Sequence, residues 1–417
     1  MIEALCHRLK ISDTVAAAGA AAYAKSVQFT YEAQHCNRFR VLEAFMEEGL
    51  AESDLAGSTG YGYDDSARDC YERLLARLFG AEAALARLSL VSGTHAIVSA
   101  LAACVPPGKV LLSVTGRPYD TLRNAIAQAP FSLCEMGMQY RELPLQDGQR
   151  IDLQAIAASI QDPDVAAIFI QRSRGYAPRH SISVSACARA VQCVRDVRPD
   201  VLILVDNCYG ELVETQEPTH VGADLIMGSL IKNIGGSIAP AGGYIAGRAD
   251  LLEAVSARLF APGLGRALGP TLGLGRSFLQ GLFLAPLVVE QVLRGLDFSA
   301  ELFASLGFGV DPLPGTQRTD IVQAIRLQTP DRVLAFATGL QKAMPVNGRF
   351  RPEPGPVPGY RDPVIMSSGA FIAGATIELS CDAPLREPYE VYLQGGVMAE
   401  HAMIGSLLAA DAVLAAT

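Results

Sequence analysis

Continuous apolar runs recur through the middle of the chain and predict buried β-strands. Each run is apolar throughout rather than alternating with polar residues, and the runs cover 110–114, 165–170, 201–205 and 225–227. Strands of this kind occur where helices cover both faces of a parallel sheet. Helical patterns lie between the runs, over 121–129 and 183–197. The spacing therefore predicts β-α-β units.

The two ends of the chain predict different elements. Residues 1–50 predict helices, 51–65 a loop rich in Gly, Ser, Asp and Tyr, and Ser66 to Phe79 a further helix. Towards the C-terminus the pattern predicts helices over 287–296, 331–343 and 397–416, strands over 321–325 and 372–379, and a proline-rich loop over 345–363. We predict a helical segment 1–55, a large α/β domain 56–290 with a mostly parallel sheet, and a smaller C-terminal α/β domain 291–417.

Composition narrows the class of protein. The net charge of −9 argues against nucleic acid or an anionic membrane as the main partner. No apolar run approaches the roughly 20 residues of a membrane span, and acidic residues precede the alanine-rich stretch 15–24, which favours a helix over a signal peptide. Nine scattered cysteines without a C-x-x-C pair fit reduced thiols. We expect a cytoplasmic protein.

One lysine stands out from this background. The chain has five lysines against 29 arginines, and Lys232 lies in the glycine-lined, uncharged segment Gly228-Ser-Leu-Ile-Lys-Asn-Ile-Gly-Gly236. A lysine amine becomes a useful nucleophile when burial or a neighbouring cation lowers its pKa, and arginine cannot do this chemistry. We therefore expect Lys232 to be a reactive amine with a lowered pKa.

Asp206 ends the apolar run 201–205, twenty-six residues before Lys232. Ligands of open α/β sheets bind at the carboxyl ends of the strands. A carboxylate there can hold a pyridine nitrogen protonated, or can serve as a helix N-cap or a magnesium ligand.

Ser229 precedes Lys232 by three residues. Ser-x-x-Lys fits a phosphate contact, an ordinary helix, or an acyl-serine hydrolase, but the Lys-Thr-Gly element of those hydrolases is absent.

A second polar turn, Ser92-Gly93-Thr94, precedes the apolar helix predicted over 97–103. Its amides, hydroxyls and helix dipole suit a phosphate, although such a turn also serves as a plain helix cap. His95 fits a core histidine or a cofactor contact equally. Tyr119, after the next strand, is placed to stack on an aromatic ring, or else lies in an interface. The order of phosphate turn, aromatic residue, strand-end aspartate and Ser-x-x-Lys matches a fold-type I pyridoxal-phosphate enzyme.

Longer segments carry a family resemblance. They are GSTGYGYDD (57–65), VSGTHAI (91–97), TGRPYDTL (115–122), IQRSRGY (170–176), VDNCYGELVE (205–214), GADLIMGSLIKN (222–233), QGLFLAP (280–286), IELSCDAPLREPY (377–389) and QGG (394–396). With these, the chain resembles the aluminium-resistance / methionine γ-lyase-like family of pyridoxal-phosphate enzymes, which is related to the Cys/Met-metabolism lyases.

The resemblance implies an aspartate aminotransferase-like fold of type I, with an active site shared across the interface of a homodimer, often within a homotetramer. Carried over, Lys232 is the Schiff-base lysine and Asp206 the partner of the pyridinium nitrogen. Tyr119 stacks on the ring and donates a proton. The phosphate contacts fall on Ser92, Gly93, Thr94 and Ser229.

Further residues follow from the same resemblance. Tyr61 and Tyr63 lie where related lyases send a Tyr-x-Arg to the neighbour's phosphate, and the second position here is Tyr63, so the charged contact comes from elsewhere. Arg172 is a candidate near the ring or phosphate. For the substrate carboxylate, which favours a bidentate arginine, we choose Arg386, with Arg361 and Arg351 as alternatives; a solvated surface role fits each of them as well.

The resemblance implies a lyase that acts on a small amino acid. Lys232 removes the Cα proton, a sulfur or halide group leaves from Cβ or Cγ, and Tyr119 or the partner's Tyr61 supplies a proton. The loop after the lysine departs from the family pattern Asn-Pro-Gly-Gly-Gly and Pro-Thr-Gly-Gly-Tyr at Ile234, Ser237 and Ala241. This departure leaves the substrate open, and a specialised natural-product γ-lyase that forms an alkyne fits it. An aminotransferase, a racemase and a non-catalytic cofactor-binding protein linked to metal tolerance are the alternatives.

Overall fold

The computed structural model describes residues 2–416, which divide into two compact units. One unit is Cys36–Ala285, and the other combines Met1–His35 with Pro286–Thr417. Two long helices, α3 (Glu32–Glu48) and α10 (Gly275–Ser305), contain the points at which the chain passes from one unit to the other. The domain ranges expected from the sequence stay a prediction.

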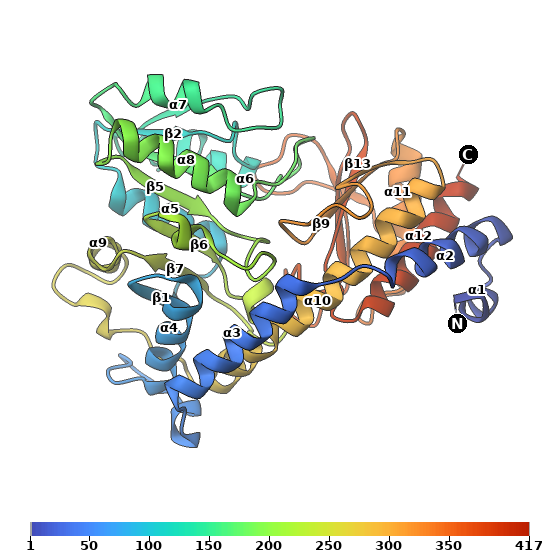
Figure 1. The fold of residues 1–417 in the computed structure, drawn as a ribbon, viewed down its shortest axis with the longest axis horizontal. Helices are drawn as coiled ribbons and strands as arrows, with labels where there is room; N and C mark the ends of the chain where they lie inside the picture. Colours follow the sequence, from blue (N-terminus) through green and yellow to red (C-terminus); the bar gives the residue numbers. More distant parts are fainter. Residues whose placement is uncertain (1, 417) are drawn as a thin grey trace. The chain divides into compact units, whose positions relative to one another are not determined.

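The unit Cys36–Ala285 is built on a mostly parallel sheet in the strand order β1-β7-β6-β5-β4-β2-β3 (Figure 1). Among the described strands of this sheet, β7 alone runs in the opposite direction to all the others. The strands are β1 (Ala83–Arg87), β2 (Val110–Ser113), β3 (Gln139–Glu142), β4 (Val165–Gln171), β5 (Leu202–Asp206), β6 (Leu225–Ser229) and β7 (Gly243–Gly247).

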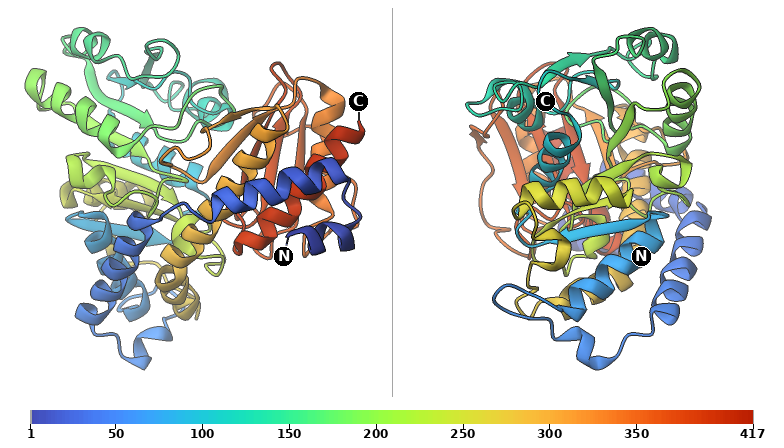
Figure 2. Two further views of the ribbon diagram at one scale, coloured as in Figure 1. Left: turned by 45° about the vertical axis from the view of Figure 1, so that its right-hand side comes forward. Right: turned by 90° about the vertical axis from the view of Figure 1, so that its left-hand side faces the viewer.

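Helices lie on both sides of this sheet, as Figures 1 and 2 show. They are α4 (Ser66–Phe79), α5 (Gly93–Cys104), α6 (Asp120–Arg123), α7 (Leu153–Ser159), α8 (Val184–Val197) and α9 (Ala249–Leu259). α5 packs on α9, β6 and β7, while α8 packs on α7. Ile97, Leu204 and Met227 are fully buried in the core between α5 and the sheet. The α/β fold expected from the apolar runs is confirmed.

The other unit carries a second, antiparallel sheet in the order β10-β11-β12-β13-β9-β8. Its elements are α1 (Ile2–Leu9), α2 (Asp13–Ser26), β8 (Gly309–Asp311), β9 (Val322–Arg326), α11 (Pro330–Gln341), β10 (Pro354–Gly355), β11 (Val364–Ser368), β12 (Ser380–Pro384), β13 (Glu390–Gln394) and α12 (Ala399–Ala415). Both α11 and α2 pack on α12.

Three of the expected elements differ in the structure. The strand expected over 372–379 is wrong: the Glu378 carboxylate accepts the backbone N–H groups of Phe371 and Ile372, which folds the segment into turns, and β12 begins only at Ser380. The helix expected over 121–129 is split into α6 and a π-helical turn over 124–128. The helix expected over 287–296 is the middle of α10, which continues through Pro286.

Among the described residues, α10 alone is long and apolar enough to cross a membrane, counter to the expectation that no segment would be. However, 67% of its most apolar stretch is buried inside the protein. A core helix of a globular protein passes the same test, so length and apolar composition are weak evidence for a membrane span here.

Candidate active site

Lys232 lies in the turn that follows β6, directly before the short 3-10 helix Asn233–Gly235. Its side chain is partly exposed, and its Nζ lies 3.8 Å from the centre of the Tyr209 ring. A cation over the face of a tyrosine ring is held by the ring quadrupole. The amine therefore has a defined place above the loop that follows β5.

Asp206 is the last residue of β5, and β5 is hydrogen-bonded in parallel to β6. Adjacent parallel strands end at the same edge of a sheet, which brings the carboxyl group close to the lysine turn. Asp206 is 1% exposed, and its Oδ1 accepts the backbone N–H of Cys208 at 3.1 Å. Burial raises the pKa of Asp206, and the charge of Lys232 acts in the opposite direction.

The two alternatives for Asp206 find no support in the described part of the chain. No helix starts at this residue, because the segment after it is a turn. No group of three or more His, Cys, Asp or Glu side chains within residues 2–416 is arranged to hold a metal ion. The role of Asp206 as the partner of a bound ring nitrogen stays a prediction.

The expected lowering of the Lys232 pKa is wrong. Burial lowers the pKa of Lys232, but the acidic side chains around it, with Cys208 and Tyr209 first, raise it above its ordinary value. Cys208 and Tyr209 lie in the turn after β5. Because this turn is distant from Lys232 in the sequence, the glycines around the lysine did not reveal them. The direction of this shift favours the ammonium form of the lysine.

The Ser92-Gly93-Thr94 turn forms the N-terminal end of α5. The Ser92 hydroxyl caps the helix by accepting the backbone N–H of His95 at 3.1 Å. A Cβ added to Gly93 would lie 3.2 Å from the Cys208 Sγ and 3.3 Å from the Ser229 Cβ. Glycine thus lets this helix end come close to the loops that follow β5 and β6. A helix N-terminus beside two hydroxyl groups is suited to an anion.

Tyr119 is joined to the same turn. Its hydroxyl lies 2.7 Å from the Thr94 Oγ1, and its backbone N–H donates to the Gln171 Oε1 at 3.0 Å. Burial and then the charge of Asp206 raise the pKa of Tyr119 well above its usual value. The hydroxyl therefore stays protonated. His95, in contrast, accepts the Val91 backbone N–H with its Nδ1, at 3.3 Å, and is not a core residue.

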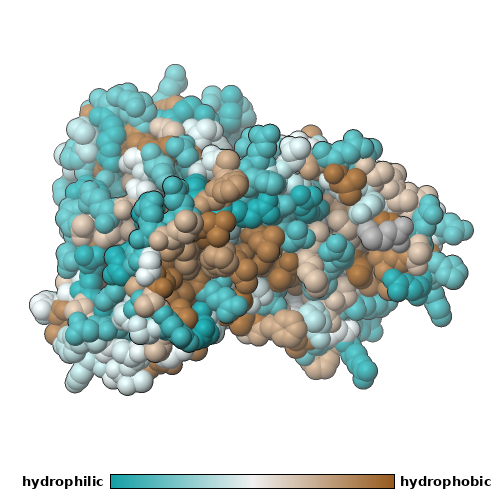
Figure 3. Space-filling view, turned by 60° about the horizontal axis from the view of Figure 1, so that its bottom comes forward, coloured by the Kyte–Doolittle hydropathy of each residue, from teal (hydrophilic) through white to brown (hydrophobic). Residues whose placement is uncertain are grey.

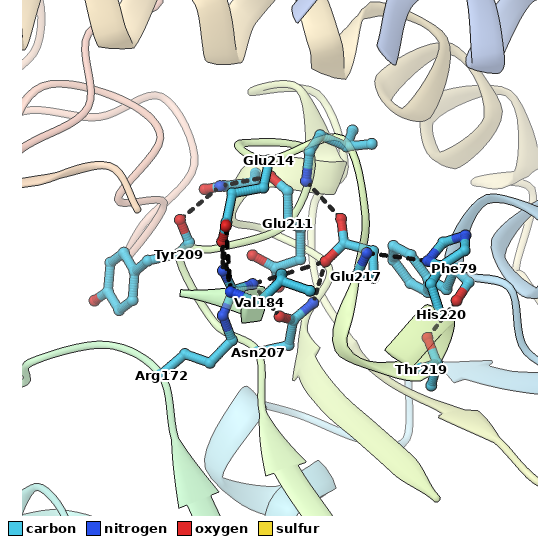
Figure 4. Close-up of polar contacts among 12 residues, drawn as sticks. Phe79, Arg172, Val184, Asn207, Tyr209, Glu211, Glu214, Glu217, Thr219 and His220 are labelled. Atoms are coloured by element: carbon cyan, nitrogen blue, oxygen red, sulfur yellow. Dashed lines mark hydrogen bonds and ion pairs between the residues drawn. The ribbon is translucent and has the colours of Figure 1, made fainter. Parts of the chain in front are cut away.

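Arg172 lies at the end of β4, in a buried polar network shown in Figure 4. Its guanidinium donates to the Asn207 Oδ1 at 2.6 Å and to the Glu214 carboxylate at 2.5 Å, and it lies 3.8 Å from Glu217. None of these described contacts is with Lys232, Tyr119 or the Ser92 turn. The network stabilises the segment after Asp206. A direct contact between Arg172 and the cofactor stays a prediction.

The remaining expected residues are not joined to Lys232 by any described contact. Tyr61 and Tyr63 lie in the loop before α4 and are 77% and 56% exposed. The loop is held in shape by the buried Asp65, whose carboxylate accepts the backbone N–H groups of Ser58 and Thr271. Arg386 belongs to the other compact unit, where it pairs with Asp362 at 3.5 Å. Their roles stay predictions.

Three residues at the site were missed from the sequence. Cys208 hydrogen-bonds Asp206 through its backbone, Tyr209 covers Lys232, and Asn233 donates its amide to the backbone oxygens of Tyr209 and Glu211 at 3.0 and 2.9 Å. Cys208 and Tyr209 follow the strand-end aspartate directly, and Asn233 follows the lysine. Their positions next to Asp206 and Lys232 in the sequence could have identified them as residues of the site.

Comparison with known proteins identifies the family. The family model described as methionine gamma-lyase matches residues 13–414. The chain belongs to this family. It is 42% identical over 382 residues to the uncharacterized protein YnbB of Bacillus subtilis, covering 91% of this chain and 90% of that one. It is 41% identical to the crystal structure of a carbon-sulfur lyase involved in aluminum resistance from Clostridium novyi, with a TM-score of 0.92 over 98% of this chain and 97% of that one.

More distant structures share only the fold. Cystathionine gamma-lyase from yeast is 17% identical and superposes with a TM-score of 0.58 over 83% of this chain and 86% of that one. The methionine gamma-lyase family comprises carbon–sulfur lyases that depend on pyridoxal phosphate. The resemblance that the sequence motifs indicated is confirmed.

Proposed function

We propose that this protein is a pyridoxal-phosphate-dependent lyase that cleaves a carbon–sulfur bond of a small amino acid. The observation that carries the proposal is the convergence of the Lys232 amine, the buried Asp206 carboxyl group and the N-terminal end of α5 at one edge of the sheet. A reactive amine, an acid for a ring nitrogen and an anion site are the three contacts that this cofactor requires.

The residues present fit the cofactor. Gly93 lets the N-terminal end of α5 come close to Ser229, and the hydroxyl groups of Ser92, Thr94 and Ser229 would hold the phosphate. Asp206 would hold the ring nitrogen, and the half-buried Tyr119 would lie against the ring. Lys232 would hold the cofactor through its amine.

When bound, pyridoxal phosphate supplies an electron-accepting ring conjugated to the amino nitrogen of the substrate. In its neutral form, Lys232 would remove the Cα proton, and for a leaving group at Cγ it would release that proton before taking a second one from Cβ. Tyr119 is our choice of proton donor to the leaving sulfur, since its hydroxyl keeps its proton in the folded protein. The partner's Tyr61 is a second donor in this proposal.

Sulfur is the leaving group that we favour over halide, because the relative from Clostridium novyi is named a carbon-sulfur lyase. Elimination at Cγ and at Cβ use the same residues of this chain. The departures at Ile234, Ser237 and Ala241 are the argument for a specialised amino acid, such as one that yields an alkyne after γ-elimination of a halide. Arg386 is our choice for its carboxylate.

We further propose a homodimer or homotetramer in which Tyr61 and Tyr63 reach the neighbouring site. α3 exposes Phe39, Leu42 and Met46, and Figure 3 shows apolar side chains gathered in the middle of one face of the molecule. Contiguous exposed apolar surface is typical of interfaces between subunits. Light scattering of the purified protein measures the assembly, and a monomer would contradict the proposal. A cytoplasmic location stays a prediction.

A panel of β- and γ-substituted amino acids tests the reaction. We expect a keto acid and a thiol or sulfide in equal amounts, with the cofactor regenerated after each turnover. Accumulation of an aminated cofactor would indicate an aminotransferase, and a change of Cα configuration alone would indicate a racemase. Bound cofactor without exchange of the Cα proton for deuterium would indicate a binding protein.

A further inference from the structure

Glu211 is a buried carboxyl group close to Lys232 to which the proposed reaction gives no role. The residue is fully buried, and its Oε1 accepts the Tyr244 hydroxyl at 2.9 Å. Its Oε2 has no hydrogen-bond partner among the residues that the structure describes, and no described lysine or arginine forms an ion pair with it. A carboxylate buried in this way is costly, so the group is expected to be a neutral acid.

The backbone of Glu211 is tied to the lysine turn. Asn233, next to Lys232, donates one amide group to the backbone oxygens of both Tyr209 and Glu211. The ring of Tyr209 in turn covers the Lys232 Nζ, and in Figure 4 it points away from the carboxyl groups of the network. A displacement of Glu211 would therefore move both the backbone that anchors Asn233 and the ring above the amine.

Charged and titratable groups from several elements act on Glu211 or are acted on by it. They are Tyr71 of α4, Arg172 after β4, Cys208 and Glu217 after β5, Lys232 after β6, and Tyr244 of β7. Burial, aided by the charge of Glu217, raises the pKa of Glu211 to about 8, while its own backbone N–H and the Tyr244 hydroxyl lower it. Burial raises the pKa of Glu217 as well, while Arg172 and the hydrogen bonds from the Leu212 N–H and the Asn207 amide favour its charged form.

We propose that Glu211 is a positioning residue for Lys232: as a neutral acid it fixes the turn Tyr209–Glu211, and through Asn233 it fixes the lysine. On ionisation the carboxylate is repelled by Glu217 and attracted by Lys232, so the turn shifts and the amine with it. The inference rests on the proposed function of Lys232. It adds that the geometry of the site depends on the protonation of one buried glutamic acid.

Two measurements on the full-length protein with bound pyridoxal phosphate test this inference. Infrared spectra between about pH 6 and about pH 10 follow the carboxylic acid band, a range that spans the expected midpoint near 8. Visible circular dichroism of the bound cofactor reports how the site holds it. We expect both signals to change together in the wild type, and both changes to be absent from Glu211→Gln, which keeps an acceptor for Tyr244 but cannot ionise.

Two further variants move the midpoint in opposite directions. Glu217→Gln removes the negative charge that raises the Glu211 pKa, so the midpoint should shift to lower pH. Tyr244→Phe removes the hydrogen bond that lowers this pKa, so the midpoint should shift to higher pH. A purely structural role predicts no such ordered shifts. Melting temperatures at about pH 6, where Glu211 is neutral in the wild type, check that each variant is folded.

The outcomes separate this inference from the proposed function. An infrared titration without a change in circular dichroism would overturn the positioning role, even with the cofactor bound at Lys232. A circular-dichroism transition that persists in Glu211→Gln would overturn it as well. A protein that binds no cofactor at Lys232 would instead contradict the proposed function, while the infrared band would still show whether Glu211 titrates.

Discussion

At the scale of single residues, the amine of Lys232 lies among several buried acidic side chains. Asp206, Cys208 and Tyr119 all have a raised pKa for which burial is the first cause, and each of them interacts with the charge of Lys232. Cys208 also hydrogen-bonds Asp206. The positions of Lys232 and Asp206 could be predicted from the sequence, because Asp206 ends one apolar run and Lys232 follows another. Tyr209 and Cys208 could not be assigned, because only the turn after β5 places them against the amine.

Asp206→Asn tests the strand-end acid. The amide keeps the size of the side chain but lacks the negative charge that would hold a ring nitrogen protonated. We expect cofactor binding to persist and Cα proton exchange to fall by about 100-fold or more, as when one electrostatic stabiliser of a reaction is removed. Deuterium exchange of the amino acid, followed by NMR, measures this rate. Asp152→Asn, at the cap of α7, is the control, since asparagine caps a helix as well; equal rates in both variants would count against the role of Asp206.

At the scale of elements, the prediction from sequence succeeded where burial is uniform. The strands β2, β4, β5 and β6 are buried throughout or nearly so, and the apolar runs located each of them. The helix over Ser66–Phe79 matched because Asp65 caps it and Gly80 ends it in a left-handed conformation. The strand predicted over 372–379 is wrong because the Glu378 side chain accepts backbone N–H groups that a strand would need.

Gly93→Ala tests the close approach of α5 to the loops after β5 and β6. The new methyl group would lie 3.2 Å from the Cys208 Sγ and 3.3 Å from the Ser229 Cβ, so these neighbours must give by a few tenths of an ångström. Overpacking of this kind costs about 1–3 kcal/mol. We expect weaker cofactor binding by roughly tenfold or more, measured by equilibrium dialysis of pyridoxal phosphate. Gly355→Ala meets no atom within 4 Å and is the matched control; undiminished affinity in Gly93→Ala would argue against a phosphate at this turn.

At the scale of the whole molecule, membership of the methionine gamma-lyase family and the mostly parallel sheet both favour a candidate site at the carboxyl ends of the strands. The lysine, the acid and the anion site come from the ends of β6, β5 and the start of α5, three places far apart in sequence. A parallel sheet brings such ends to one edge, which is why the order of motifs along the chain was informative. The contribution of a second subunit lies beyond what one chain's sequence can specify, because it depends on which surface a partner covers.

The most direct test of the account is the identity of the lysine that carries the cofactor. The protein would be loaded with pyridoxal phosphate, reduced with borohydride and digested, and the modified peptide identified by mass spectrometry. The chain has five lysines, so the assignment is unambiguous. The account predicts the adduct on Lys232 and its loss in Lys232→Ala. An adduct on Lys10, Lys25, Lys109 or Lys342, or an unchanged adduct in the variant, would contradict it.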